Sequence, residues 1–333
     1  MINSHVFSYY FVGDKMLKEK ALKKIFITTI AIFIVLVIYS IKQIGSDVTV
    51  FDDAYYIESS DKSVIYALNK DNYISKTTVY VNNKLSIEEK VKNLLEIMTT
   101  KNNKNALLPS YFKPILPKNT KVEKVELDQD ILKVTFNQAL MDIDAEQSEK
   151  MLEAIIYTLT EFDEVLGIEI YVENNLLKYV PHSKKQLTTM LDRDFGINKV
   201  YNLDNLNNIN KVSLYYLSYN NDDFYYVPIT KYLNDEREKI ELIVEYLSNS
   251  YIYEEPLKSF LNVNTKLKDY KIENKVMTLT FSEDIIDSTE FEIIKKESIN
   301  PILLSVFDNY DVQKVEIIIN DNKILEKTKK DIE

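Results

Sequence analysis

The chain contains no cysteine, only four glycines and only two histidines among its 333 residues. The absence of cysteine excludes thiol nucleophiles, disulfides and cysteine-bound zinc or iron–sulfur centres. The glycines form no glycine-rich phosphate-binding loop, and the histidines, His5 and His182, form no HExxH zinc motif. We therefore predict that the protein holds no metal and no cofactor.

The charge is acidic and unevenly distributed. Residues 1–42 carry six lysines and two acids, a net charge of +4, so the overall charge of −11 leaves −15 for residues 43–333. Such a surface repels nucleic acid and anionic membranes. We expect no nucleic-acid partner.

One long run, Ile25–Ile41, carries no charge over 17 residues, which is the short end of the range for a membrane-spanning helix. Five lysines precede it within residues 15–24, and this bias places the N-terminus in the cytoplasm. A cleaved signal peptide is the alternative, but the run is long for one and no small-residue cleavage site follows it. We therefore predict a cell-membrane protein with a cytoplasmic segment over 1–24, one transmembrane helix over 25–41 and extracytoplasmic C-terminal domains.

The extracytoplasmic part repeats itself. Three pairs of segments match in the same order, at offsets of 149, 145 and 147 residues: Glu89–Met98 with Glu238–Leu247, Asn119–Gln138 with Asn264–Glu283, and Ile168–Asn175 with Val315–Asn322. The offsets change only between segments, where loops tolerate insertions. The chain therefore holds two copies of one small fold, over 63–177 and 212–323.

Each copy begins with two β-rich runs around a polar turn, which is typical of a hairpin. These runs are Ser63–Leu68 and Tyr73–Val81 in copy one, and Val212–Leu217 and Phe224–Thr230 in copy two. Pro228 should place its strand at an edge or end its pairing.

Two helices follow in each copy, because apolar residues recur at positions i, i+3, i+4 and i+7. Ser86 with Glu89, and Asp235 with Glu238, have the spacing of a capping box at the first helix. Pro301 lies inside the second helix of copy two and is expected to break it there.

With two further strands after the first helix and one after the second, each copy has the order ββ-α-ββ-α-β. This order predicts an α+β fold with two helices on one face of a mixed sheet. The remaining segments are a linker over 42–62, a mainly loop-forming inter-repeat segment over 178–211 and a charged, frayed tail over 324–333.

The two copies resemble the GerMN domain family of sporulation and spore germination. The matching pieces in copy one are LPKNTKVEKVEL, LKVTF and AIIYTLTEFDEV (Ala154–Val165) leading into IEIYVENN; copy two diverges to LLSVFDNYDV (Leu303–Val312). Asn175 and Asn322 stand where the family tends to have glycine. The resemblance implies a fold similar to ring-building domains, and partners among other envelope and sporulation membrane proteins or further copies of the chain.

Two sets of residues suggest chemistry or binding. Paired carboxylates can hydrolyse glycans, and acids cluster after the second helices at Glu161, Asp163, Glu164, Asp308 and Asp311. Without a catalytic signature they are expected to be solvated acids at a helix end. His182 is expected to be solvated too, since no nucleophile-elbow sequence accompanies it.

Tyrosine is abundant, with 24 residues, and five lie on the copy-two hairpin: Tyr215, Tyr216, Tyr219, Tyr225 and Tyr226. Alternation along a strand directs some of them outward. We therefore predict an exposed aromatic patch on this hairpin, of the kind that marks a contact with a partner.

The sequence thus favours a non-enzymatic, membrane-anchored, extracytoplasmic assembly or scaffold protein that acts in sporulation or spore germination through protein–protein contacts. Its contacts would be spread over sheet edges and helix faces, so no catalytic or partner-binding residue is named. The alternative is a cell-wall-associated binding or sensory module unrelated to spores. An enzyme acting on glycan is the third hypothesis.

Overall fold

The structure is a computed structural model that describes residues 30, 60–82, 84–221, 223–249, 257–286 and 294–332. Glu58–Glu333 form one compact unit. The transmembrane helix predicted over 25–41 lies outside the described residues, apart from Ile30. No helix in the described ranges is long and apolar enough to cross a membrane.

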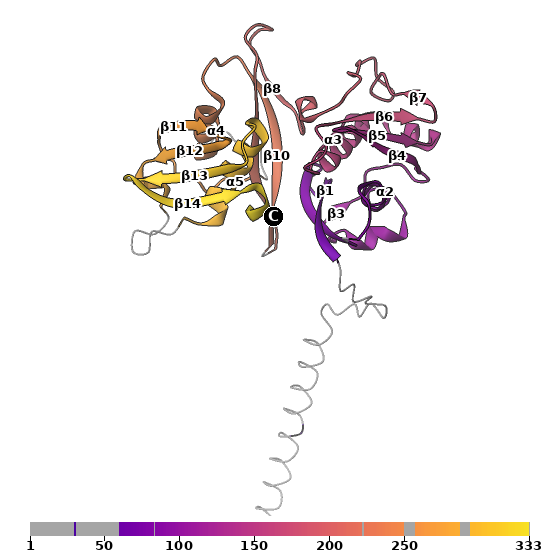
Figure 1. The fold of residues 1–333 in the computed structure, drawn as a ribbon, viewed down its shortest axis with the longest axis horizontal. Coiled ribbons are helices and arrows are strands. Elements are labelled where there is room, and N and C mark those ends of the chain that lie inside the picture. The colour runs from indigo at the N-terminus through magenta and orange to yellow at the C-terminus, as the bar shows by residue number, and fades with distance from the viewer. Residues whose placement is uncertain are drawn as a thin grey trace, which may run out of the picture. The chain divides into compact units, whose positions relative to one another are not determined.

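Copy one contains two sheets and two helices (Figure 1). A hairpin and a short third strand form the sheet β2-β1-β3, and a second sheet has the order β4-β5-β6-β7. The elements are β1 (Ser60–Asn69), β2 (Ile74–Asn82), α2 (Ile87–Ile97), β3 (Phe112–Lys113), β4 (Val122–Asp128), β5 (Ile131–Phe136), α3 (Ser148–Leu159), β6 (Gly167–Val172) and β7 (Asn175–Leu176).

Copy two repeats this arrangement, and the inter-repeat segment adds one strand to its hairpin, in the order β8-β10-β9. Its second sheet has the order β11-β12-β13-β14. The elements are β8 (Val200–Asn202), β9 (Asn210–Asn220), β10 (Asp223–Leu233), α4 (Lys239–Ser248), β11 (Leu267–Glu273), β12 (Val276–Phe281), α5 (Lys296–Asn309), β13 (Lys314–Ile319) and β14 (Asn322–Thr328).

The four-stranded sheets are mixed, because β5 and β6, like β12 and β13, run parallel while the outer pairs run antiparallel. The mixed α+β architecture in two tandem copies is confirmed, but each hairpin belongs to a sheet of its own. In copy one the second helix, α3, contacts both the hairpin and the four-stranded sheet. All nine residues from Met151 to Leu159 are therefore buried, as expected of a helix covered on all sides.

The predicted caps of the first helices have different outcomes. At α2 the capping box is present: the Ser86 hydroxyl accepts from the Glu89 N–H, and the Glu89 carboxylate accepts from the Ser86 N–H. The prediction for α4 is wrong, because this helix begins at Lys239 after Glu238, which caps nothing with its side chain. Asp235 binds Arg237 instead.

The predicted break at Pro301 is also wrong, since α5 continues from Lys296 to Asn309. Proline at this position removes one main-chain N–H from the early part of the helix. The buried side chains of Ile299, Ile302 and Leu303 hold the helix against the core despite that loss. Tertiary packing overrides local propensity here.

The two hairpins differ in length. Leu68 pairs with Ile74 in copy one. The matching Leu217 of copy two pairs with Tyr226, which lies three residues beyond Asp223, the residue 149 positions after Ile74. Leu68 and Leu217 are equivalent in space as well, because each also bonds a strand-like residue on its other side, Lys113 or Lys258. Ile74 and Tyr226 therefore occupy equivalent positions at the outer edge of their hairpins.

The C-terminal tail is ordered, contrary to the prediction that residues 324–333 fray. Asn322–Thr328 pair with β13 as an edge strand, and Lys329–Ile332 form a short 3₁₀ helix. The side chain of Asp331 accepts from both the N–H and the hydroxyl of Thr328, which fixes the turn between them.

Candidate functional site between the repeats

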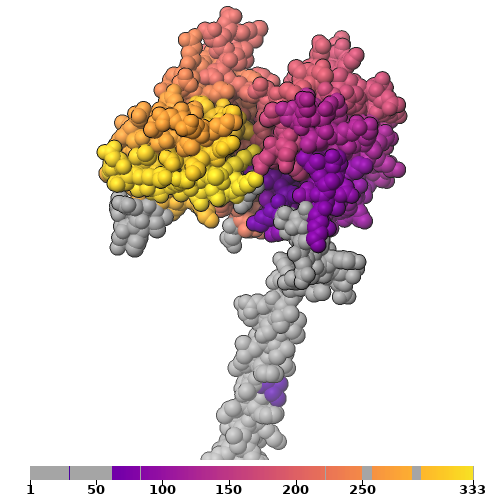
Figure 2. Space-filling view, in the orientation of Figure 1, coloured from indigo at the N-terminus to yellow at the C-terminus, as the bar shows by residue number. Residues whose placement is uncertain are grey.

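The repeats meet along a seam where residues from the inter-repeat segment and the C-terminal tail come together, and Figure 2 shows the yellow C-terminal surface reaching copy one. At its centre lies Arg193, the first residue of a short 3₁₀ helix, Arg193–Phe195, in the inter-repeat segment. The Asp192 carboxylate caps this turn by accepting from the Asp194 N–H. The turn directs the Arg193 side chain away from solvent, with 20% of it exposed.

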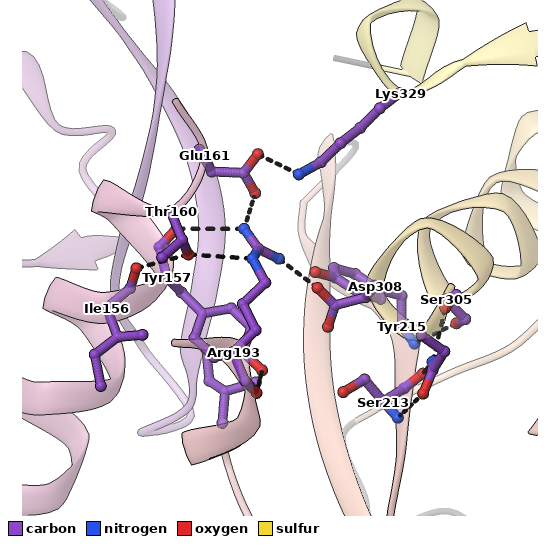
Figure 3. A network of polar contacts seen from close by, with 12 residues as sticks. Ile156, Tyr157, Thr160, Glu161, Arg193, Ser213, Tyr215, Ser305, Asp308 and Lys329 are labelled. Carbon is purple, nitrogen blue, oxygen red and sulfur yellow. Dashed lines mark hydrogen bonds and ion pairs between the residues drawn. The ribbon is translucent and has the colours of Figure 1, made fainter. Parts of the chain in front are cut away.

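Arg193 binds one carboxylate from each repeat (Figure 3). Its Nη2 lies 2.7 Å from Glu161 Oε1, and its Nη1 is ion-paired with Asp308. Its Nε donates to Thr160 Oγ1 at 3.2 Å, and its guanidinium carbon lies 4.7 Å from the centre of the Tyr157 ring. One guanidinium thus joins the ends of α3 and α5.

The contact has an internal symmetry. Glu161 and Asp308 are equivalent residues of the two copies, 147 positions apart. Tyr66 and Tyr215, 149 positions apart, place their hydroxyl oxygens 3.3 Å from each other. Equivalent residues that contact each other are the mark of an approximate two-fold axis. Arg193 lies where the two matching acids converge.

Matching hydrogen bonds hold the two tyrosine strands onto their helices. The N–H of Tyr66 donates to Thr158 Oγ1 at 2.9 Å, and the N–H of Tyr215 donates to Ser305 Oγ at 2.9 Å. Thr158 and Ser305 are themselves equivalent and fully buried. Each copy therefore builds its half of the contact in the same way.

The anionic form of Glu161 is strongly stabilised at this interface. Only 6% of its side chain is exposed, so burial raises its pKa, but the charges of Lys76, Arg193 and Lys329 outweigh burial and hold the pKa well below its ordinary value. Lys329, from the C-terminal 3₁₀ helix, lies 2.7 Å from Glu161 Oε2. The tail of copy two is thus part of the contact with copy one.

Arg193 and the two buried tyrosines beside it keep their ordinary protonation. Burial lowers the pKa of Arg193, but Glu161 and Asp308 raise it well above its usual value. Burial raises the pKa of Tyr66, whose hydroxyl donates to Glu161 Oε1 at 2.8 Å, and the pKa of Tyr157. The cluster therefore stays charged at Arg193 and Glu161 and neutral at the tyrosines around pH 7.

A second contact joins the two hairpins through Asn198. Its side chain accepts from the Ile74 N–H at 2.9 Å and donates to the carbonyls of Ile74, at 2.7 Å, and Pro228, at 2.8 Å. Asn198 has a φ of 45°, which asparagine tolerates better than most residues. Gly196 is required two residues earlier, because it has a φ of 77° and a Cβ there would lie 2.8 Å from the Tyr232 hydroxyl oxygen.

Charged and aromatic groups continue this contact. Lys199 lies 2.7 Å from both Glu149 and Glu153, and its Nζ stands 3.9 Å from the centre of the Phe195 ring. Burial raises the pKa of Glu153 although Lys199 opposes that rise. Tyr111 of copy one stacks on Tyr225 of copy two, with ring centres 5.5 Å apart.

The acids predicted as solvated residues at a helix end fall into two groups. Asp163, Glu164 and Asp311 are exposed, as expected. The prediction is wrong for Glu161 and Asp308, whose side chains are 6% and 2% exposed because the other repeat covers them. A glycosidase acid needs a raised pKa, and the lowered pKa of Glu161 does not fit that role.

The predicted aromatic patch on the copy-two hairpin is wrong for most of its members. Tyr215, Tyr216 and Tyr225 are buried, and Tyr219 and Tyr226 are partly buried. Alternation gives the face of a strand but not the element that covers that face. His182 is exposed as predicted, with its Nε2 2.9 Å from the carbonyl oxygen of Met141.

Sequence reasoning missed Arg193, Asn198 and Lys199, because all three lie in a segment expected to be mainly loop. One signal points to Arg193: it is one of only two arginines, with Arg237, among 41 basic residues. In a chain that uses lysine almost everywhere, an arginine indicates a site that needs the planar guanidinium group and its several N–H donors. Among the described residues, no group of three His, Asp or Glu is placed to hold a metal ion.

The comparisons agree with this architecture. The family model described as "Germane: Sporulation and spore germination" matches residues 55–178 and 213–325. The chain is 26% identical over 262 residues to the spore germination protein GerM of Bacillus subtilis (strain 168), covering 77% of this chain and 70% of that protein.

Among solved structures, the chain is similar to the tandem GerMN domains of the sporulation protein GerM from Bacillus subtilis. The TM-score is 0.71 at 24% identity, over 79% of this chain and 92% of the other, which supports the same fold. The sequence resemblance to GerMN domains is confirmed. The chain therefore belongs to the Germane family of sporulation and spore germination proteins, as a tandem of two GerMN domains.

Proposed function

We propose that this protein is a non-enzymatic assembly protein that acts in sporulation or spore germination. An N-terminal helix over 25–41 would anchor it in the cell membrane, and the two domains would work outside the cytoplasm. Its partners would be other envelope and sporulation membrane proteins or further copies of itself, and it needs no cofactor.

The observation that carries this proposal is the buried ionic cluster around Arg193. A largely buried ion pair is a poor source of stability but is suited to fixing one arrangement of the parts it joins. Here the cluster joins the two domains within one compact unit. A fixed pair of domains suits a component whose role is to present surfaces at a set spacing.

One outer strand of each four-stranded sheet carries features that oppose edge-to-edge pairing. β4 and β11 each contain a bulge near their start and exposed charged pairs, Lys124 with Glu126 and Lys271 with Glu273. Charges and bulges on edge strands are known devices against such pairing. The specific contacts of this protein are therefore expected elsewhere on its surface.

The test is the count of heat-resistant spores in a deletion strain of the source organism. A severe loss that an anchored copy restores, and that a copy without residues 1–41 does not restore, supports the proposal. Normal spore counts would reject it and favour a cell-wall-associated binding or sensory module. Restoration by both copies would reject the anchored part of the proposal alone.

A further inference from the structure

Copy one has a groove at the outer edge of its hairpin, and an extended segment of the same chain fills it. The main-chain N–H and C=O of Ile74 point out of the hairpin and bind the Asn198 side chain. The Asn198 N–H donates to Glu153 Oε2 at 2.9 Å, and Lys199 is ion-paired with Glu149 and Glu153 on α3. The ring of Phe195 lies beneath Lys199.

No segment among the described residues occupies the equivalent groove of copy two. Tyr226 stands where copy one has Ile74. On α5, Lys296 stands where copy one has Glu149, and Asn300 stands where copy one has Glu153, each at an offset of 147. These residues line a cavity of about 570 Å³ together with apolar side chains of β10, α5 and β14: Phe224, Ile299, Ile324 and Leu325. Cavities of this size, apolar with a few polar groups, are typical of binding sites.

The edge of β10 presents the main-chain N–H and C=O of Tyr226 at this groove. Leu217, the partner of Tyr226, bonds Lys258 on its far side, so the N–H and C=O of Tyr226 point away from β9. The inter-repeat segment pairs with β10 from Pro228 onward, through Asn198, Ile197 and β8. No hydrogen bond reaches the main chain of Tyr226 from the described residues.

The charge of the groove is reversed between the copies. In copy one two carboxylates, on Glu149 and Glu153, receive the ammonium group of Lys199. In copy two the matching side chains are a cation and a neutral amide, and Lys327 adds a second cation to the lining. Among the described residues that line the cavity, Asp331 is the one acid, and its carboxylate accepts two hydrogen bonds from Thr328.

We propose that the copy-two groove binds an extended segment of a partner polypeptide that carries an acidic side chain where the copy-one segment carries Lys199. The main chain or an amide side chain of that segment pairs with Tyr226, and an apolar residue of the segment enters the cavity. The carboxylate pairs with Lys296. The inference rests on the proposed function only in assigning the segment to another protein.

The chain supplies its own probe. A fluorescein-labelled peptide of residues 194–202 (DFGINKVYN) reproduces the copy-one segment, and a second peptide carries the substitution Lys199→Glu. Fluorescence anisotropy with the full-length protein in detergent measures the affinity of both. We expect the Lys199→Glu peptide to bind about fivefold more tightly or better, the effect of one partly exposed ion pair.

A charge exchange on the protein tests the site itself. Lys296 is exposed and begins α5, where glutamate is favourable, so Lys296→Glu should fold normally. This variant should reverse the preference and bind the unmodified peptide more tightly. Lys271→Glu, on the exposed face of β11, is the matched control and should leave the preference unchanged.

Equal affinity for the two peptides, a preference that Lys296→Glu leaves as it was, or no binding of either peptide at millimolar concentration would overturn the inference. These outcomes are read apart from spore counts. A protein that is needed for sporulation but binds neither peptide keeps the proposed function and loses this site. A protein that binds as expected but is not needed for spores does the reverse.

Discussion

Replacement of Arg193 by alanine tests whether the ionic cluster holds the two domains together. The variant leaves Asp308 buried with no other ion pair among the described residues, while Lys329 remains beside Glu161. Removing one member of a buried ion pair typically costs about 3–5 kcal/mol. Because Glu161 keeps a partner and Arg193 is 20% exposed, we expect the free energy of unfolding to fall by about 3 kcal/mol, the lower end of that range.

The assay is urea unfolding of residues 58–333, followed by tyrosine fluorescence and circular dichroism at pH 7. Arg237→Ala is the matched control, because Arg237 is exposed and its ion pairs with Asp235 and Glu245 are worth at most about 1 kcal/mol. We expect one transition for the wild type and two for Arg193→Ala, as the domains begin to unfold separately. A loss no larger than that of Arg237→Ala would refute the reasoning.

A combined variant separates the cost of unpaired charge from the cost of lost packing. Arg193→Leu with Asp308→Asn removes both members of the pair that loses its partner, while Glu161 keeps Lys329 beside it. Replacement of a whole buried ionic group is often nearly neutral, in contrast to removal of one member. The combined variant should recover most of the stability that Arg193→Ala loses. If it is as unstable as the single variant, unpaired charge is not the cause.

Three further predictions follow from the same interface. The folded-state pKa of Glu161 lies well below 4.5, so its contribution to stability is complete above about pH 4.5 and is lost as the pH falls through the folded-state value. In acid, the unfolding free energy should therefore fall less steeply with pH for Glu161→Gln than for the wild type. Equal slopes for the two proteins would contradict the lowered pKa of Glu161. Asn198→Ala leaves the main-chain groups of Ile74 and Pro228 without their partner and should cost about 2–3 kcal/mol, with faster hydrogen exchange at the Ile74 amide. Lys329→Ala removes a partly exposed ion pair and should cost about 1 kcal/mol or less, with faster exchange confined to the C-terminal tail; global loss of protection would show that the tail does more than this pair.

The helices and strands were predictable because they depend on periods of two to four residues, and the repeats because these patterns recur in the same order at offsets of 145 to 149 residues. The α2 cap was predictable for the same reason, since Ser86 and Glu89 are three positions apart. The α4 cap failed because Arg237 competes for Asp235. Local pattern decides where an element lies, and nearby charges decide its ends.

The interface was not predictable from such patterns. Arg193 meets Asp308 across 115 positions, and Asn198 meets Ile74 across 124. Tyr215 was expected on an exposed patch, yet the other repeat covers it. The one sequence signal was the presence of arginine in a chain that otherwise uses lysine, and it identifies a demanding site without naming the partners.

The single arginine near the two-fold axis has a consequence for how this contact could have arisen. Two separate, identical subunits that associate about an axis must contribute every residue in pairs. They would bring two arginines to the two matching acids, or none. One guanidinium shared by Glu161 and Asp308 is available only to copies joined in one chain, with one connecting segment between them. The connection therefore breaks the symmetry of the pair, and the two domains expressed as separate chains with identical connecting segments should not reproduce this interface.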